Sequence, residues 1–426
     1  MNVTGIIAEF NPFHNGHAYL LQKARAITGA DILVVVMSGN FVQRGAPAIV
    51  SKYARAKTAL CCGADLIAEL PVFASCASAE YFAEGALRIL RDLGADSFVF
   101  GSESGDLSAL LPLSGLLCDE PAAYKKHLRD GLSSGKCFPA ARREAVLALL
   151  PDAAPLLDTP NNLLALEYLK ACRRRGFSLR PHTVARLGSP YLESTLPADE
   201  LSGESPFRES LSSHSFPSAS ALRSYIRTDA PGQTQLLPYM PAAAGEILAK
   251  EIAGHTPVYE SDLSSLLAWQ LLQCSSPVEL AVYADMGNGL AARVFAKRYQ
   301  PIRLPDFIMD LKTKELTHTR ISRALLHTVL QIRSEEQEAF RAMPRSPYVR
   351  ILGMRPAAQP LLARLKKEGD VPLILRPARA KKLLPPQAYH FFMKDIAAAQ
   401  LYRQLSSTRS HLTSACEFTH EIIRRE

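Results

Sequence analysis

The chain has 426 residues, of which 47% are hydrophobic and 21% are charged, a length that suggests two or three domains with large cores. No apolar run reaches the roughly 18 residues that a membrane-spanning helix needs. Glu9 and His14 interrupt the N-terminal stretch where a secretory signal would be unbroken. We therefore expect a cytoplasmic protein with no membrane association.

The eight cysteines form no CxxC pair and have no metal-ligand spacing with histidine. In a chain without a secretory signal, such cysteines are typical of reduced thiols. We therefore expect no structural zinc site and no dedicated metal site.

Positive charge is concentrated late in the chain. Residues 301–426 hold 22 Lys and Arg against 12 Asp and Glu, whereas residues 1–300 hold 27 against 29. A concentrated basic region is typical of a protein that binds a polyanion such as RNA. A basic surface that is simply solvated is the alternative interpretation.

The first motif is an apolar run, Val3 to Ala8, that leads through a turn into a helical pattern from Ala18 onward. The turn carries His14 and His17, with Asn-Gly between them. Gly16 would let the backbone approach a phosphate, and the N–H groups and dipole of the helix attract an anion. Imidazole donors would then stabilise charge on a nucleotide triphosphate, which indicates adenylyl transfer. An ordinary histidine-containing turn is the alternative.

Strand and helix patterns alternate after this turn, as in a Rossmann-like, doubly wound parallel sheet of an α/β protein. Ligands of such sheets bind beyond the carboxyl ends of the strands, where we expect His14, Ser38, Gly39 and Gly101 to meet. The sequence predicts strands at 3–8, 32–37, 65–70, 97–100, 180–185 and 371–376. It predicts helices at 51–62, 78–93, 163–175 and across 107–150.

A second anion site is predicted where a helix begins after the segment 197–217, which is rich in Ser, Glu and Pro. Ser218 and Ser220 supply hydroxyls at the helix start, and Arg223 follows within one turn. Hydroxyls and a guanidinium together suit the outer phosphates of a nucleotide.

The His-x-Gly-His turn and the late Ser-x-Ser-x-x-Arg helix start resemble the HxGH nucleotidyltransferase superfamily, which includes cofactor adenylyltransferases and class I aminoacyl-tRNA synthetases. The match to bacterial tRNA(Met) cytidine acetate ligases is closer and spans most of the chain. Ala46 departs from that family's pattern, in which an acidic residue usually follows Arg-Gly. The resemblance rests on the segments 5–17, 37–45, 63–71, 100–103, 160–162, 317–323 and 348–353.

This resemblance implies an enzyme that forms acetyl-adenylate from acetate and ATP and acetylates N4 of the wobble cytidine, C34, of elongator tRNA(Met). Magnesium is expected with the triphosphate, and no protein partner is predicted. His14, His17 and Arg223 are the catalytic candidates. The expected nucleotide contacts are Ile7, Ala8, Glu9, Phe10, Asn11, Pro12, Phe13, His14, Asn15, Gly16, His17, Ala18, Tyr19, Leu20, Gly101, Asn162, Arg186, Leu187, Ser218 and Ser220. Two further phosphate contacts are considered, at Lys23 and Lys52.

We expect residues 1–230 to form the ATP-binding catalytic domain and residues 231–426 to form a basic, mainly helical tRNA-binding region. Backbone phosphates would be held by Lys312, Lys314, Arg320 and Arg323, and by Arg376, Arg379, Lys381 and Lys382.

Two alternatives stay open at this point. A cofactor adenylyltransferase acting on a small phosphate ester would explain the nucleotide site but leave the basic region unused. A non-catalytic RNA-binding protein would explain the charge but not the intact His14, Gly16, His17 and Arg223.

Overall fold

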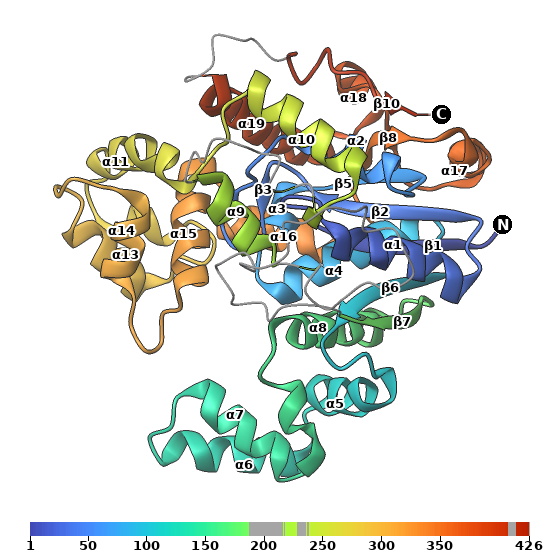
Figure 1. Ribbon diagram of the computed structural model, residues 1–426. Coiled ribbons are helices and arrows are strands. Elements are labelled where there is room, and N and C mark those ends of the chain that lie inside the picture. The colour runs from blue at the N-terminus through green and yellow to red at the C-terminus, as the bar shows by residue number, and fades with distance from the viewer. Residues whose placement is uncertain (187–215, 217, 228–235, 237, 408–414, 426) are drawn as a thin grey trace.

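A β-sheet forms the middle of the molecule, and the N-terminal motif follows the carboxyl end of one of its strands (Figure 1). The structure is a computed structural model that describes residues 1–186, 216, 218–227, 236, 238–407 and 415–425. The strands of the sheet are β1 (Val3–Ala8), β2 (Ile32–Ser38), β5 (Leu66–Leu70), β6 (Ser97–Ser102), β7 (Arg180–Ala185), β8 (Val349–Met354), β9 (Leu373–Ile374) and β10 (Ile423–Arg424).

The strands lie in the order β10-β8-β5-β2-β1-β6-β7, and β9 pairs with β8. The five strands from β5 to β7 are parallel and have the doubly wound order, so the predicted α/β architecture is confirmed. β8 runs antiparallel to β5, and β9 and β10 run parallel to β8. The sheet is therefore mixed, and the predicted strand at 371–376 is reduced to Leu373–Ile374.

Side chains from alternate positions of each strand enter two separate hydrophobic cores, one on each face. Ile6, Val35 and Ile67 pack in one core, and Val34 and Leu66 pack in the other. The first face is covered by α1 (Asn15–Thr28), α2 (Lys52–Cys61) and α10 (Ala242–Gly254). The second is covered by α3 (Val72–Ser75), α4 (Ala79–Asp92), α8 (Pro160–Arg175) and α19 (Pro386–Ser407).

Two groups of helices project from the sheet on different sides (Figure 1). The group below the sheet in that view is α5 (Leu107–Asp119), α6 (Ala122–Ser133) and α7 (Phe138–Leu147). The other is α11 (Ser264–Leu272), α12 (Pro277–Ala281), α13 (Asn288–Ala296), α14 (Leu304–Leu311) and α15 (His318–Leu330).

The other helices, strands and turns of the described residues lie outside these groups. They are β3 (Phe41–Val42), β4 (Ala46–Pro47), α9 (Ala219–Arg227), α16 (Ser334–Ala342), α17 (Gln359–Glu368), α18 (Ala380–Leu383), and the 3-10 turns Pro151–Leu156, Glu260–Leu263, Pro356–Ala358 and Pro377–Arg379.

A buried quartet of charges joins the two halves of the chain beside β5 and β8. The Lys52 ammonium pairs with Glu69 at 2.8 Å and with Glu417, and Arg350 pairs with Glu417 at 2.6 Å and with Glu69 at 3.2 Å. Burial raises the pKa of Glu417, but the two cations outweigh it and lower that pKa to about 2. Lys52 is fully buried in this quartet, so the prediction that it contacts a phosphate is wrong.

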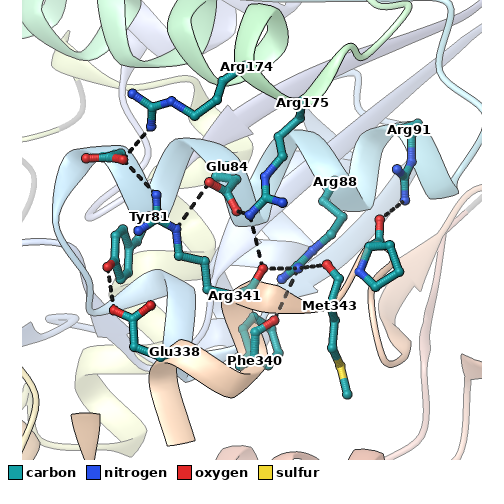
Figure 2. A network of polar contacts seen from close by, with 12 residues as sticks. Tyr81, Glu84, Arg88, Arg91, Arg174, Arg175, Glu338, Phe340, Arg341 and Met343 are labelled. Atoms are coloured by element: carbon teal, nitrogen blue, oxygen red, sulfur yellow. Dashed lines mark hydrogen bonds and ion pairs between the residues drawn. The ribbon is translucent and has the colours of Figure 1, made fainter. Parts of the chain in front are cut away.

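A second polar network fastens α16 to the helices on the second face, as Figure 2 shows. Glu80 and Glu84 of α4 pair with Arg174 and Arg175 of α8, and Arg341 of α16 reaches both carboxylates, at 2.7 and 3.3 Å. The shared carboxylates hold three helices in one arrangement.

Arg88 of α4 extends this second network to the end of α16. Its guanidinium donates to the carbonyl oxygens of Phe340, Arg341 and Met343, the last at 2.6 Å (Figure 2). These carbonyls lie at the helix C-terminus, where no further helical N–H group can bind them. Arg88 therefore both caps α16 and binds it to α4.

None of the helices in the described part of the chain has the length and hydropathy of a membrane span. All eight cysteines are free thiols, and the described residues contain no cluster of three side chains that could hold a metal ion.

We expect Glu417→Gln to lower the free energy of unfolding by about 3 to 5 kcal/mol at pH 7, because it leaves two buried cations with one carboxylate. The contribution of Glu417 is present above its ordinary pKa near 4.5 and is lost as the pH falls toward 2. Denaturant titrations at several pH values measure both effects. The exposed Glu421→Gln is the matched control, and equal stability of the two variants at pH 7 would contradict the expectation.

Candidate active site

A cavity of about 250 Å³ lies beyond the carboxyl ends of β1, β6 and β7. Its walls come from the turn after β1, the start of α1, the end of β7 and the start of α9. The polar and charged side chains that line it are Glu9, Asn11, His14, His17, Gln43, Arg44, Asn161, Arg186, Ser220 and Arg223. This is the edge at which doubly wound sheets bind ligands.

The two histidines cap the start of α1 reciprocally. His14 is the N-cap residue, and its Nδ1 accepts a hydrogen bond from the Gly16 N–H at 3.1 Å. The Nδ1 of His17 accepts from the His14 N–H at 3.2 Å. The two rings stack with their centroids 3.8 Å apart, so they face the cavity as a pair.

These hydrogen bonds determine which ring nitrogens carry protons. A backbone N–H can only donate, so both Nδ1 atoms are unprotonated acceptors, and neutral imidazole then carries its proton on Nε2. Burial, Arg186 and Arg223 lower the pKa of His14 to about 3, and burial and His14 lower the pKa of His17 well below its ordinary value. Both rings are therefore neutral Nε2–H donors at pH 7.

Three arginines give the cavity a positive potential. Burial lowers the pKa of Arg44, Arg186 and Arg223, but each guanidinium stays charged at neutral pH. Arg223 donates to the Asn11 carbonyl oxygen at 2.8 Å and to the Ser220 hydroxyl at 3.0 Å, which fixes its position. Glu9 is the single acidic side chain among the described residues of the lining, so the cavity suits a polyanion.

Arg55, which is almost fully buried, holds the strand ends that carry this cavity. Its guanidinium donates to the carbonyl oxygens of Glu9 at 2.7 Å, Ser38 at 3.1 Å and Gly39, and its Nε donates to Val50 at 3.2 Å. Ser38 and Gly39 were expected at the ligand edge, but they do not line the cavity and instead supply these carbonyl groups.

Comparison with known proteins identifies the relatives of this chain. The family model for the HIGH nucleotidyl transferases matches residues 1–415. A tRNA(Met) cytidine acetate ligase of Acetivibrio thermocellus is 35% identical over 430 residues, covering 99% of this chain and all of that protein. The enzyme of the same name from Thermoanaerobacter pseudethanolicus is 35% identical over 428 residues and covers both chains completely.

The chain belongs to the tRNA(Met) cytidine acetate ligase family.

A solved structure supports the same conclusion. Thermotoga maritima TmcAL, crystallised with alpha-thio ATP, aligns over all of both chains with a TM-score of 0.87 and 29% sequence identity. The apo form of that protein aligns equally well. This agreement confirms the family resemblance that the sequence motifs indicate.

Most residues predicted for the nucleotide site of this family member do line the cavity. They are Ile7, Ala8, Glu9, Phe10, Asn11, His14, Gly16, His17, Tyr19, Leu20, Gly101, Arg186, Ser220 and Arg223. Those that do not line it are Pro12, Phe13, Asn15, Ala18, Asn162 and Ser218, and Leu187 lies outside the described residues. Lys23 is exposed on α1 and does not line the cavity either.

Two of the predicted residues that do not line the cavity have structural partners nearby. The Asn162 side-chain oxygen accepts from the backbone N–H groups of Glu103, at 3.0 Å, and Ser104, at 3.2 Å. The Ser218 hydroxyl accepts from the Ala221 N–H at 3.1 Å in the first turn of α9. Direct contact of either residue with a nucleotide stays a prediction, whereas Asn161, the neighbour of Asn162, does line the cavity.

Sequence reasoning missed the apolar wall of the cavity and three polar residues that line it. Arg44 lies in the family motif at 37–45, so its place in that motif could have identified it as a site residue. Most of the apolar residues come from helices α4 and α8 and from strands β6 and β7, whose patterns indicate only burial. The unpredicted lining residues are Gln43, Arg44, Phe82, Phe100, Asn161, Leu164, Tyr168, Val184, Ala185, Phe216 and Ala219.

We expect the His14 and His17 rings to remain neutral, with the proton on Nε2, at pH 6. Their charged forms are disfavoured in the folded chain, so the stability that they contribute is present above the ordinary pKa of 6.5. It is lost as the pH falls from there toward about 3, the pKa of His14. Nitrogen-15 NMR of the imidazoles tests this, with His14→Ala and His17→Ala assigning the signals. Doubly protonated rings at pH 6 would contradict it.

Proposed function

We propose that this chain forms acetyl-adenylate from acetate and ATP and then acetylates N4 of the wobble cytidine, C34, in elongator tRNA(Met). The observation that carries the proposal is the pair of neutral Nε2–H donors on His14 and His17, set among three arginines in a cavity at the N-terminus of α1. The names of the relatives support tRNA(Met) cytidine as the acceptor, and the alpha-thio ATP bound to the Thermotoga protein supports ATP as the nucleotide.

In the first step an acetate oxygen attacks the α-phosphorus of ATP, and the bond from that phosphorus to pyrophosphate breaks. Negative charge builds on the α-phosphate and on the leaving group. His14 and His17 would donate hydrogen bonds to these oxygens without losing a proton, and Arg223 with Ser220 would hold the outer phosphates. Because the donors are fixed before the substrate arrives, little reorganisation is needed during the reaction.

Magnesium would accompany the triphosphate. The described residues offer no cluster of metal ligands, and Glu9 is the acidic side chain that lines the cavity. Mg²⁺ keeps several waters and needs few protein ligands when phosphates hold it, so the cavity is compatible with a metal that arrives with ATP. When bound, it would neutralise phosphate charge.

In the second step the N4 amine of the cytidine attacks the acetyl carbonyl carbon. The bond between that carbon and the phosphate oxygen breaks, AMP leaves, and N4 gives up one proton. A base-modifying enzyme needs its base splayed out of the stack, and the anticodon loop presents a single strand for that purpose.

We assign tRNA backbone binding to the basic residues after position 230. Lys312, Lys314 and Arg320 are exposed near the start of α15. The second basic cluster lies beside α18, and its exposed members are Arg376, Arg379, Lys381 and Lys382. The prediction for Arg323 is wrong, since this side chain is buried and pairs with Asp285 at 2.8 Å.

The assignment of ATP binding to residues 1–230 and of tRNA binding to residues 231–426 also belongs to this proposal. β8 and β10 come from the second half and complete the central sheet. The two parts therefore share one sheet, and they differ in the role that we propose for each. A cytoplasmic location follows from a tRNA substrate and agrees with eight free thiols.

The direct test is pyrophosphate release from ATP, with and without acetate and total tRNA, followed by mass analysis of tRNA nucleosides. We expect pyrophosphate only when acetate is present, and N4-acetylcytidine only when tRNA is added. Pyrophosphate release that does not depend on acetate, together with AMP transfer to a small phosphate ester, would instead favour a cofactor adenylyltransferase.

His17→Ala tests the role of the paired donors. We expect acetate-dependent ATP–pyrophosphate exchange to fall by about 10²- to 10³-fold, because one donor to the developing charge is lost. His127→Ala, on the exposed face of α6, is the matched control and should keep full exchange. Full tRNA acetylation by His17→Ala would overturn the proposed mechanism.

A further inference from the structure

A second cavity, of about 170 Å³, opens beside the first. The two cavities share four lining residues, which are Glu9, Asn11, Arg44 and Arg223. Its remaining walls are Val42, Ala46, Pro47, Ile49, Arg227, Val258, Tyr259, Glu260, His318, Thr319 and Ser322. A ligand in the second cavity would therefore lie against whatever occupies the phosphate end of the first.

The second cavity lies between the two halves of the chain. The β3–β4 ribbon supplies one wall, and the 3-10 turn at Glu260–Leu263 and the start of α15 supply the opposite wall. The ribbon is pinned to α15, since the Ser322 hydroxyl donates to the Gly45 carbonyl oxygen at 2.9 Å. Gly45 has φ of 79°, and a Cβ there would lie 2.4 Å from the Arg323 backbone nitrogen, so only glycine permits this approach.

The lining of the second cavity differs in charge from that of the first. Glu9 and Glu260 place two carboxylates among the basic side chains of the lining, which are Arg44, Arg223, Arg227 and His318. Glu260 pairs with Arg227 at 2.7 Å, and the Arg227 guanidinium lies 5.0 Å from the centre of the Tyr259 ring. Carboxylates repel an anion, so this mixture suits a neutral, planar group with both donors and acceptors.

Cytosine has those properties. Its N4 amine donates and suits Glu or Asp, whereas its N3 and O2 accept and suit guanidinium or imidazole donors. Glu9 is the carboxylate common to both cavities, and its Oε1 is fixed by the Gln43 N–H at 2.9 Å. An amine facing Glu9 from the second cavity would meet the acetyl group of an adenylate held in the first.

We propose that this second cavity is the pocket for the acceptor cytosine, an inference that rests on the proposed function. The bond from N4 to the acetyl carbon forms, the bond from that carbon to the AMP oxygen breaks, and the N4 proton passes to Glu9. Glu260, Arg44 and His318 bind the edge of the base, and the start of α15 lies on the side from which the RNA strand enters.

Ala46→Leu tests the pocket by filling it. Ala46 lines the second cavity and not the first, so acetate-dependent ATP–pyrophosphate exchange should stay within about twofold of the unchanged chain. Single-turnover acetyl transfer to a tRNA(Met) transcript should fall at least about tenfold, the size of one lost base contact. Ala253→Leu, exposed on α10, is the matched control for both assays.

Glu260→Gln supplies a second variant that keeps the volume of the side chain. It should also slow the transfer while sparing the exchange, whereas Glu315→Gln, exposed outside the cavity, should change neither. Glu9→Gln should slow transfer from added acetyl-adenylate by more than about tenfold. An unchanged rate with Glu9→Gln would remove this residue as the proton acceptor.

Photo-crosslinking keeps the test independent of these variants. A transcript with 5-iodocytidine at position 34 should crosslink to peptides that contain Tyr259 or His318. Normal transfer by Ala46→Leu, equal loss of exchange and transfer in Glu260→Gln, or crosslinks only outside the second cavity would each overturn the proposal. Absence of acetate-dependent exchange in the unchanged chain would instead refute the proposed function itself.

Discussion

The site depends on one buried guanidinium. Arg55 binds the backbone oxygens of Glu9, Ser38 and Gly39, so the carboxyl ends of β1 and β2 converge on a single side chain from α2. Burial lowers the pKa of Arg55 to about 10, which still leaves it charged at neutral pH. A carbonyl group buried at this point without a donor would cost about 1 to 3 kcal/mol. Glu9 and the turn that carries His14 and His17 take their positions from this anchor.

Besides the pairing of β8 with β5, three contacts of different chemistry help to join the two halves of the chain. The quartet around Lys52 and Glu417 connects α2 and β5 to the C-terminal segment. The arginine and glutamate network of Figure 2 fastens α16 to α4 and α8. The close contact of Gly45 with α15 brings the wall of the second cavity against the strand ends. Both cavities therefore depend on packing between segments more than 200 residues apart.

Local patterns predicted the parallel strands and, from Ala18 onward, the helix α1 that begins at Asn15, because apolar runs and turn residues act over short distances. They could not predict β8, whose antiparallel pairing with β5 spans almost 300 residues. Lys52 and Arg323 were wrongly expected to bind phosphates, because the sequence around a cation does not show the distant carboxylate with which it pairs. The apolar wall from α4 and α8, with Phe82 and Tyr168, was missed because burial in a core and burial against a ligand produce the same helical pattern.

The quartet also has a consequence for synthesis of the protein. Lys52 is made early, but its partner Glu417 leaves the ribosome 365 residues later. Until then Glu69 is the single carboxylate of the quartet that has been made, and it pairs with Lys52. Once Arg350 has been made, two cations of the quartet share that carboxylate. Residues 1–230 consequently reach their final stability only after translation has passed residue 417, and the β5 edge of the sheet has no strand beside it until β8 has been made.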